Sequence, residues 1–168
     1  CADEMFCAAI QYDSQLDACS LFERITAELP VGCELLKLNI LPYKTDFKPC
    51  GAVYRFPVDF DKLGGSIEAR INDLNGALSS GKSLMVERRG NEEKAVVKKV
   101  NITPYIRAVR KGDGYVEFEC IVSGAGTVRP EELPALLGLE AGDLTGVIVR
   151  QKICWQVRPQ PNGVKQKD

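Results

Sequence analysis

The chain has 168 residues, of which 45% are hydrophobic and 27% charged, and its formal net charge is −1. These values are typical of one globular domain or two small ones. Histidine is absent, which excludes Ser-His-Asp triads, Cys-His dyads and histidine-ligated metals built by this chain alone. No apolar run approaches the roughly 20 residues of a transmembrane helix, and no basic and apolar leader opens the chain, so we expect a cytoplasmic protein.

The first half of the chain predicts a β-α-β-β-α-β order. Short apolar runs predict the strands, apolar residues at helical spacing predict the helices, and Pro30 ends the first helix. The expected strands cover residues 4–12, 34–41, 51–58 and 83–89, and the expected helices cover residues 14–29 and 61–78. This order is the ferredoxin-like pattern, in which two helices cover one face of an antiparallel sheet.

The second half predicts further strands and one helix. Strands are expected at residues 95–102, 115–123 and 147–157, a short helix or turn at 104–109, a turn at 111–114 and a helix at 130–137. We therefore predict an α+β fold with antiparallel sheets and helices on one face. Its parts are a ferredoxin-like half at residues 1–90, a smaller β-β-α-β half at 91–157 and a frayed C-terminal tail at 158–168.

Positive charge is concentrated in one segment. Between Lys82 and Lys111 there are nine basic and three acidic residues, a net charge of +6, whereas the remainder of the chain has a net charge of −7. The near-neutral total thus conceals a strong asymmetry. Such asymmetry suggests an anionic partner.

The basic segment predicts an anion-binding surface. A basic strand leads into a turn with a tyrosine and an arginine, an arrangement in which cations hold phosphates while the ring stacks on a base. The candidate residues are Arg88, Arg89, Lys98, Lys99, Tyr105, Arg107 and Arg129. The alternative is a solvated edge strand that its lysines protect from aggregation. Only one tyrosine lies among the basic residues, and no RNA-recognition or KH signature occurs.

Other motifs favour structural roles. The glycine-rich run at residues 123–127 precedes a helix, as a phosphate loop does, but it lacks the dinucleotide and P-loop signatures. It is therefore interpreted as a simple connection. Glu117 and Glu119 are expected on the wet face of a strand, and Asp59 and Asp61 at a helix start, where capping is the simpler role.

Seven cysteines are spread widely, without a C-x-x-C pair. An odd number at wide spacing is typical of small buried hydrophobic residues in a reducing compartment. We expect neither a metal nor a cofactor bound by this chain alone, and no catalytic residue is assigned.

Several runs resemble one bacterial family. They are residues 86–89 (VERR), 101–107 (NITPYIR), 126–133 (GTVRPEEL) and 148–150 (IVR). Together they are similar to the radical SAM-linked proteins that carry domain of unknown function 2344. The resemblance extends from about residue 2 to Trp155, and it implies a partner, a radical SAM protein that is fused or encoded nearby.

The chain departs from that family at its front. The family's Phe-Leu-Ser-His-Leu-Asp and Gly-Phe-Asn-Pro motifs are absent, so any site that they form is missing here. Since the chain also begins at Cys1 rather than methionine, we expect it to be the C-terminal portion of a longer protein.

Three functions are therefore considered. The first is an accessory domain that works with a radical SAM partner and presents an anionic substrate, with RNA as a candidate. The second is a protein-interaction module whose basic segment meets an acidic surface and binds no nucleic acid. The third is an enzyme that uses a cysteine or a lysine, for which the sequence offers least support.

Overall fold

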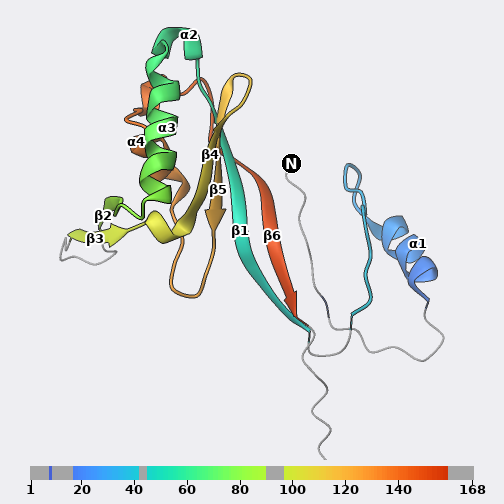
Figure 1. The fold of residues 1–168 in the computed structure, drawn as a ribbon. Coiled ribbons are helices and arrows are strands. Elements are labelled where there is room, and N and C mark those ends of the chain that lie inside the picture. Colours follow the sequence, from blue (N-terminus) through green and yellow to red (C-terminus); the bar gives the residue numbers. More distant parts are fainter. Residues whose placement is uncertain (1–7, 9–16, 42–44, 90–96, 159–168) are drawn as a thin grey trace, which may run out of the picture. The chain divides into compact units, whose positions relative to one another are not determined.

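The computed structural model describes residues 8, 17–41, 45–89 and 97–158 (Figure 1). They belong to two compact units. The larger unit contains the described residues of 49–155, and the smaller unit contains those of 5–48 and 156–158. The expected strand at residues 4–12 and the expected tail lie outside the described residues, apart from residue 8 and Arg158.

The smaller unit contains helix α1 (Ala18–Glu28). Its N-terminus is capped by Asp17, whose carboxylate accepts hydrogen bonds from the backbone N–H groups of Cys19 and Ser20. No strand follows at residues 34–41, so that prediction is wrong. The weak alternation of this segment finds no partner strand among the described residues, and Leu36 and Ile40 are exposed.

A four-stranded sheet forms the centre of the larger unit. Its strand order is β4 (Ile106–Lys111), β5 (Tyr115–Ile121), β1 (Asp46–Pro57) and β6 (Val149–Arg158), and β1 begins and β6 ends in the smaller unit. β5 pairs antiparallel with both β4 and β1. The prediction of an α+β fold with antiparallel sheets is confirmed. The described strands do not confirm the ferredoxin-like order. That order was expected within residues 1–90, whereas this sheet combines β1 from before residue 90 with β4, β5 and β6 from after it.

Two helices replace the single one expected at residues 61–78. Helix α2 (Phe60–Leu63) ends at Gly64, and helix α3 (Ser66–Ser79) follows. Gly64 has a φ of 63°, a left-handed conformation that interrupts a right-handed helix and that glycine adopts without strain. The glycine pair thus divides the predicted helix near its start.

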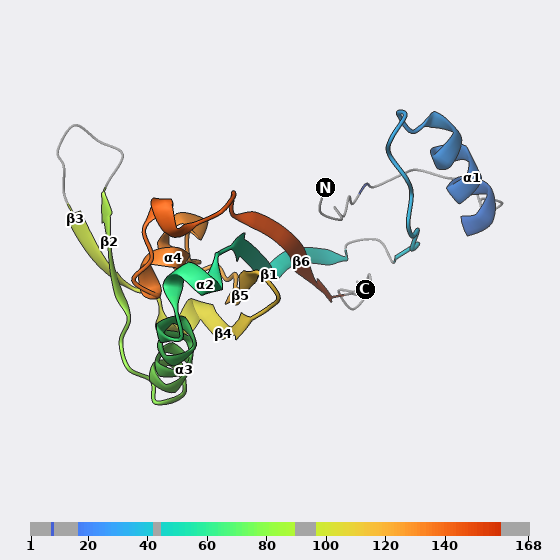
Figure 2. The same ribbon diagram turned by 90° about the horizontal axis from the view of Figure 1, so that it is seen from above.

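The core lies between one face of the sheet and the helices of the larger unit (Figures 1 and 2). Phe56 of β1 and Phe118 of β5 stack with ring centroids 5.8 Å apart and are fully buried. The buried face of α3 covers this pair with Ile67, Ile71 and Leu74. This face is the one that the helical spacing predicts, because residues three and four apart share one side of a helix.

An asparagine of α3 secures the edge strand β4. The Asn75 amide nitrogen donates to the Val109 carbonyl oxygen at 2.8 Å, and the Val109 N–H donates to the amide oxygen at 3.0 Å. Both backbone groups of this residue are therefore satisfied by a helix rather than by another strand. An edge protected in this way is less available for aggregation.

Strands β2 (Met85–Arg89) and β3 (Val97–Asn101) form a separate two-stranded sheet, called here the β2–β3 hairpin. It extends from the rest of the larger unit in both views (Figures 1 and 2). After it, the helix or turn expected at residues 104–109 is only partly correct. A 3₁₀ turn η1 (Thr103–Tyr105) is followed directly by β4, because the chain pairs with β5 from Ile106 onward.

The helix expected at residues 130–137 is present as two short turns. The 3₁₀ turn η2 (Pro130–Glu132) continues into helix α4 (Leu133–Leu136), and a further 3₁₀ turn, η3 (Ala141–Asp143), precedes β6. Leu133 and Leu137 are buried in the core. None of the helices in the described part of the chain is long and apolar enough to cross a membrane.

Candidate functional site: the basic segment and the sheet face

Two of the runs quoted above, VERR and GTVRPEEL, meet where Arg88 of the β2–β3 hairpin contacts Glu132 and Thr127. The guanidinium group of Arg88 donates from Nε to Glu132 Oε1 at 2.7 Å and from Nη2 to Glu132 Oε2 at 2.8 Å. Nη2 also donates to the Thr127 carbonyl oxygen at 2.8 Å. The same carboxylate accepts the backbone N–H of Arg129. Arg88 is therefore largely occupied by the fold and is not available to a ligand.

This contact also sets the protonation of its carboxylate. Burial alone would raise the pKa of Glu132, but the hydrogen bonds from Arg88 and from the Arg129 N–H outweigh it and hold that pKa below its usual value. The pKa of Arg88 is raised, chiefly by its hydrogen bond to Glu132. Both groups thus stay charged at neutral pH, which the ion pair between Arg88 and Glu132 requires.

Tyr105 is likewise used by the fold. Its hydroxyl donates to the Ala125 carbonyl oxygen at 3.1 Å. A Cβ atom built on Gly126 would lie 3.0 Å from that hydroxyl oxygen, so the tyrosine fills the space that the glycine leaves. The glycine-rich run is therefore a connection that packs on Tyr105, and it offers no open cradle for a phosphate.

Hydrogen bonds from Thr103 fix the start of the hairpin. The Thr103 hydroxyl donates to the Lys82 carbonyl oxygen at 2.8 Å and accepts the Leu84 N–H at 2.8 Å. The Asn101 side chain accepts the Thr103 N–H. The polar residues of the NITPY motif thus position the hairpin, which is a structural role that sequence reasoning did not assign.

The two lysines of β3 are exposed. Lys98 lies opposite Arg88, and Lys99 lies opposite Glu87 with its Nζ 4.0 Å from the Glu87 carboxylate. At this distance and exposure the ion pair contributes little. Arg129 is exposed as well, whereas the side chain of Arg89 lies outside the described part of the structure. Of the predicted anion site, Lys98, Lys99, Arg107 and Arg129 present exposed side chains.

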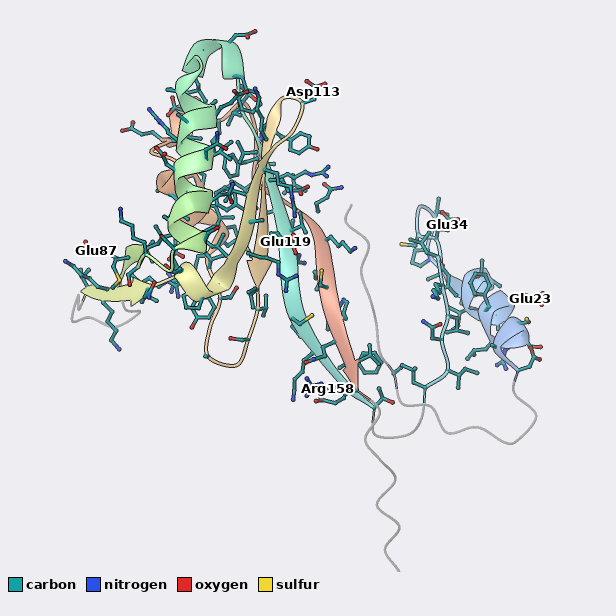
Figure 3. All side chains as sticks on the ribbon, in the orientation of Figure 1. Glu23, Glu34, Glu87, Asp113, Glu119 and Arg158 are labelled. Atoms are coloured by element: carbon teal, nitrogen blue, oxygen red, sulfur yellow. The ribbon has the colours of Figure 1, made fainter. Side chains whose placement is uncertain are left out.

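Arg107 belongs to a different surface. It lies on the face of the four-stranded sheet opposite the core, where its Nη1 is 2.9 Å from Glu119 Oε1. Figure 3 shows Glu119 on this sheet and Glu87 on the hairpin. The seven predicted residues therefore do not form one site.

Carboxylates from outside the basic segment neutralise much of the positive charge of residues 82–111. Glu132, Glu119, Glu117 and Glu68 pair with Arg88, Arg107, Arg110 and Lys111. All four acidic residues lie outside residues 82–111. The charge that is concentrated in the sequence is thus distributed in the fold over paired contacts.

Asp59 and Cys120 have structural environments. Asp59 caps α2 by accepting the N–H groups of Asp61 and Lys62, as predicted, and the Lys62 N–H in particular lowers its pKa. Burial raises the pKa of Cys120 to about 12, so this thiol is not a nucleophile at neutral pH. Among the described side chains, no group of three or more Cys, Asp or Glu residues is placed to hold a metal.

Comparisons with protein-family models, with curated proteins and with solved structures return no match for this chain.

Proposed function

We propose that this chain is an accessory domain that works with a radical SAM protein, and that the β2–β3 hairpin makes the contact between them. The partner class comes from the resemblance of the VERR, NITPYIR and GTVRPEEL runs. The contact element comes from the shape and composition of the hairpin, which extends from the larger unit (Figure 1). This is a protein-interaction function, but the contact is placed on apolar residues of the hairpin and not, as considered above, on the basic segment.

The observation that carries this proposal is the division of the hairpin into two faces. Val86 and Val100 lie opposite each other and pack against the core. By alternation along the strands, Met85 and Val97 belong to the opposite face, and they are 52% and 47% exposed. Exposed methionine in particular is common at adaptable protein-binding surfaces.

The anchoring of the hairpin supports the same conclusion. Arg88 donates hydrogen bonds to Glu132 and Thr127, and Thr103, which follows β3, donates one to Lys82. An element that is fixed in this way loses little conformational entropy when it binds a partner. The fold thus holds Met85 and Val97 in position and outside the core, on a face that also carries the exposed pair Glu87 and Lys99.

The test is co-purification with a radical SAM protein, the proposed partner. The full chain is co-expressed with a tagged partner, and the amount retained is compared between variants. Met85→Asp/Val97→Asp should reduce retention at least about tenfold, because both aspartates would be buried in the contact. Val147→Asp/Val149→Asp is the matched control, since these two valines are also exposed but lie outside the hairpin.

Equal retention of the two variants would contradict the hairpin as the contact element, and absence of any co-purification of the unmodified chain would contradict the partner class. Thermal melts of both variants, followed by circular dichroism, separate a lost contact from a lost fold.

RNA presentation is the second candidate, and the exposed pair Lys98 and Lys99 favours it. Phosphate contacts by two lysines give binding that weakens as salt rises. Fluorescence anisotropy with tRNA and with generic RNA at low and moderate salt tests this function. It requires salt-sensitive binding that Lys98→Ala/Lys99→Ala weakens. Binding that is independent of salt or of these lysines leaves protein contact alone.

A further inference from the structure

Five charged side chains form a continuous ladder across three strands of the four-stranded sheet. Glu119 of β5 accepts from Arg107 and Arg110 of β4, one at each carboxylate oxygen, both at 2.9 Å. Glu117 accepts from Arg110 at 3.3 Å and from Arg55 of β1 at 2.8 Å. We call this set, Arg107–Glu119–Arg110–Glu117–Arg55, the arginine ladder.

The ladder has two layers. The side chains of Arg107 and Arg110 are 65% and 55% exposed, whereas those of Glu119 and Glu117 are 23% and 16% exposed. The carboxylates therefore lie low on the sheet and the guanidinium groups lie above them. An approaching partner meets cations, although the set as a whole has a net charge of only +1.

The carboxylates also order the cations. Each glutamate holds two arginines in extended positions through charge-assisted hydrogen bonds. Part of the side-chain entropy that two arginines would lose on binding is already lost in the free protein. The ends of the ladder keep unused donors: Arg107 pairs through Nη1 and Arg55 through Nε.

We propose that the arginine ladder is a docking surface for an acidic, extended segment of a protein partner, separate from the β2–β3 hairpin. Arg107 and Arg110 lie on β4 and Arg55 lies on β1, with β5 between the two strands, so an extended chain that crosses these strands can present carboxylates to the guanidinium groups in turn. Charge complementarity with the exposed cationic layer selects an acidic segment.

Nucleic acid fits this surface less well. The two partly buried carboxylates lower the attraction for a polyanion, whose binding depends on neutralising many phosphates. The neighbouring aromatic ring is also occupied, because the guanidinium carbon of Arg55 lies 4.5 Å from the centroid of Tyr115. That ring is not free to stack on a base.

The test measures binding of the full chain to a short fluorescent peptide of alternating glutamate and serine, by anisotropy at low salt. Arg107→Ala/Arg110→Ala should weaken binding at least about tenfold. Lys98→Ala/Lys99→Ala is the matched control, since it removes the same charge from exposed positions on the hairpin, and its affinity should stay within about twofold.

Three results would overturn the proposal. The first is equal weakening by both variants, which indicates attraction to net charge alone. The second is equal binding of a peptide in which glutamine replaces glutamate. The third is more effective competition by oligouridylate than by the unlabelled acidic peptide, which assigns the surface to phosphates. None of these results bears on the hairpin contact.

Discussion

Arg88 of β2 and Glu132 of η2 form an ion pair with two hydrogen bonds, although 44 residues separate them in the sequence. The pair joins the β2–β3 hairpin to the turn that begins α4. Both side chains are largely buried, at 19% and 10% exposure. It is therefore a structural contact in a position where the basic segment alone predicts a ligand site.

Removal of Arg88 should destabilise the chain. Arg88→Ala leaves the Glu132 carboxylate poorly solvated and without its main partner, which costs about 1–3 kcal/mol in the free energy of unfolding. Urea denaturation followed by circular dichroism measures the difference. Lys99→Ala serves as the control and should change stability by less than about 0.5 kcal/mol, because that lysine is exposed and weakly paired. Equal stability of the two variants would show that the ion pair does not anchor the hairpin.

The same pair should make stability depend on acid. The pKa of Glu132 is lower in the fold than its usual value of 4.5, so its contribution is present above that value and is lost as pH falls through the folded pKa. Melting temperatures of the unmodified chain and of Glu132→Gln should therefore differ at pH 7 and converge as pH falls through the folded pKa of Glu132. A difference that stays constant over this range would contradict the sign of the shift.

Gly126 should tolerate no side chain. Its φ is 148°, and an added Cβ would lie 3.0 Å from the Tyr105 hydroxyl oxygen. We expect Gly126→Ala to lower the free energy of unfolding by about 1–3 kcal/mol, from backbone strain and from the close contact. Gly124→Ala in the same loop is the control, because its added Cβ meets no atom within 4 Å. Similar melting temperatures for the two variants would argue against the packing of Tyr105 beneath the loop.

Asn75→Ala should loosen the edge of the four-stranded sheet. The change leaves the N–H and carbonyl of Val109 without the side chain that satisfies both, and we expect a loss of about 1–3 kcal/mol. Hydrogen exchange should also quicken at the Val109 amide. Asn72→Ala, an exposed asparagine of the same helix, should leave both stability and exchange unchanged. Unchanged exchange at Val109 in Asn75→Ala would contradict the clamp.

Local sequence patterns predicted much of the fold, because the spacing of apolar residues reflects which side of a strand or helix is buried. Alternation placed Val116, Phe118 and Cys120 on the buried face of β5, and helical spacing placed Ile67, Ile71 and Leu74 in the core. The strand at residues 34–41 was wrong because alternation says nothing of a partner strand. The single helix at residues 61–78 was wrong because Gly64 takes a left-handed conformation that its neighbours do not reveal.

The candidate site was less predictable because ion pairs depend on tertiary structure. The carboxylates that neutralise Arg88 and Lys111 come from η2 and α3, and no local pattern links them. The pairing of Arg110 with Glu117 could have been predicted from the sequence. If residues 106–111 are interpreted as a strand, the turn at residues 111–114 makes Arg110 and Glu117 cross-strand neighbours. Because a helix or turn was expected at residues 104–109, the pairing of this segment with β5 was not predicted.

The central claim, that the β2–β3 hairpin is the contact element, is tested most directly by hydrogen–deuterium exchange of the full chain with and without a radical SAM protein, the proposed partner. The account predicts slower exchange in β2 and β3 on addition of the partner, with α3 unchanged. A complex that forms while exchange in β2 and β3 stays the same would contradict it.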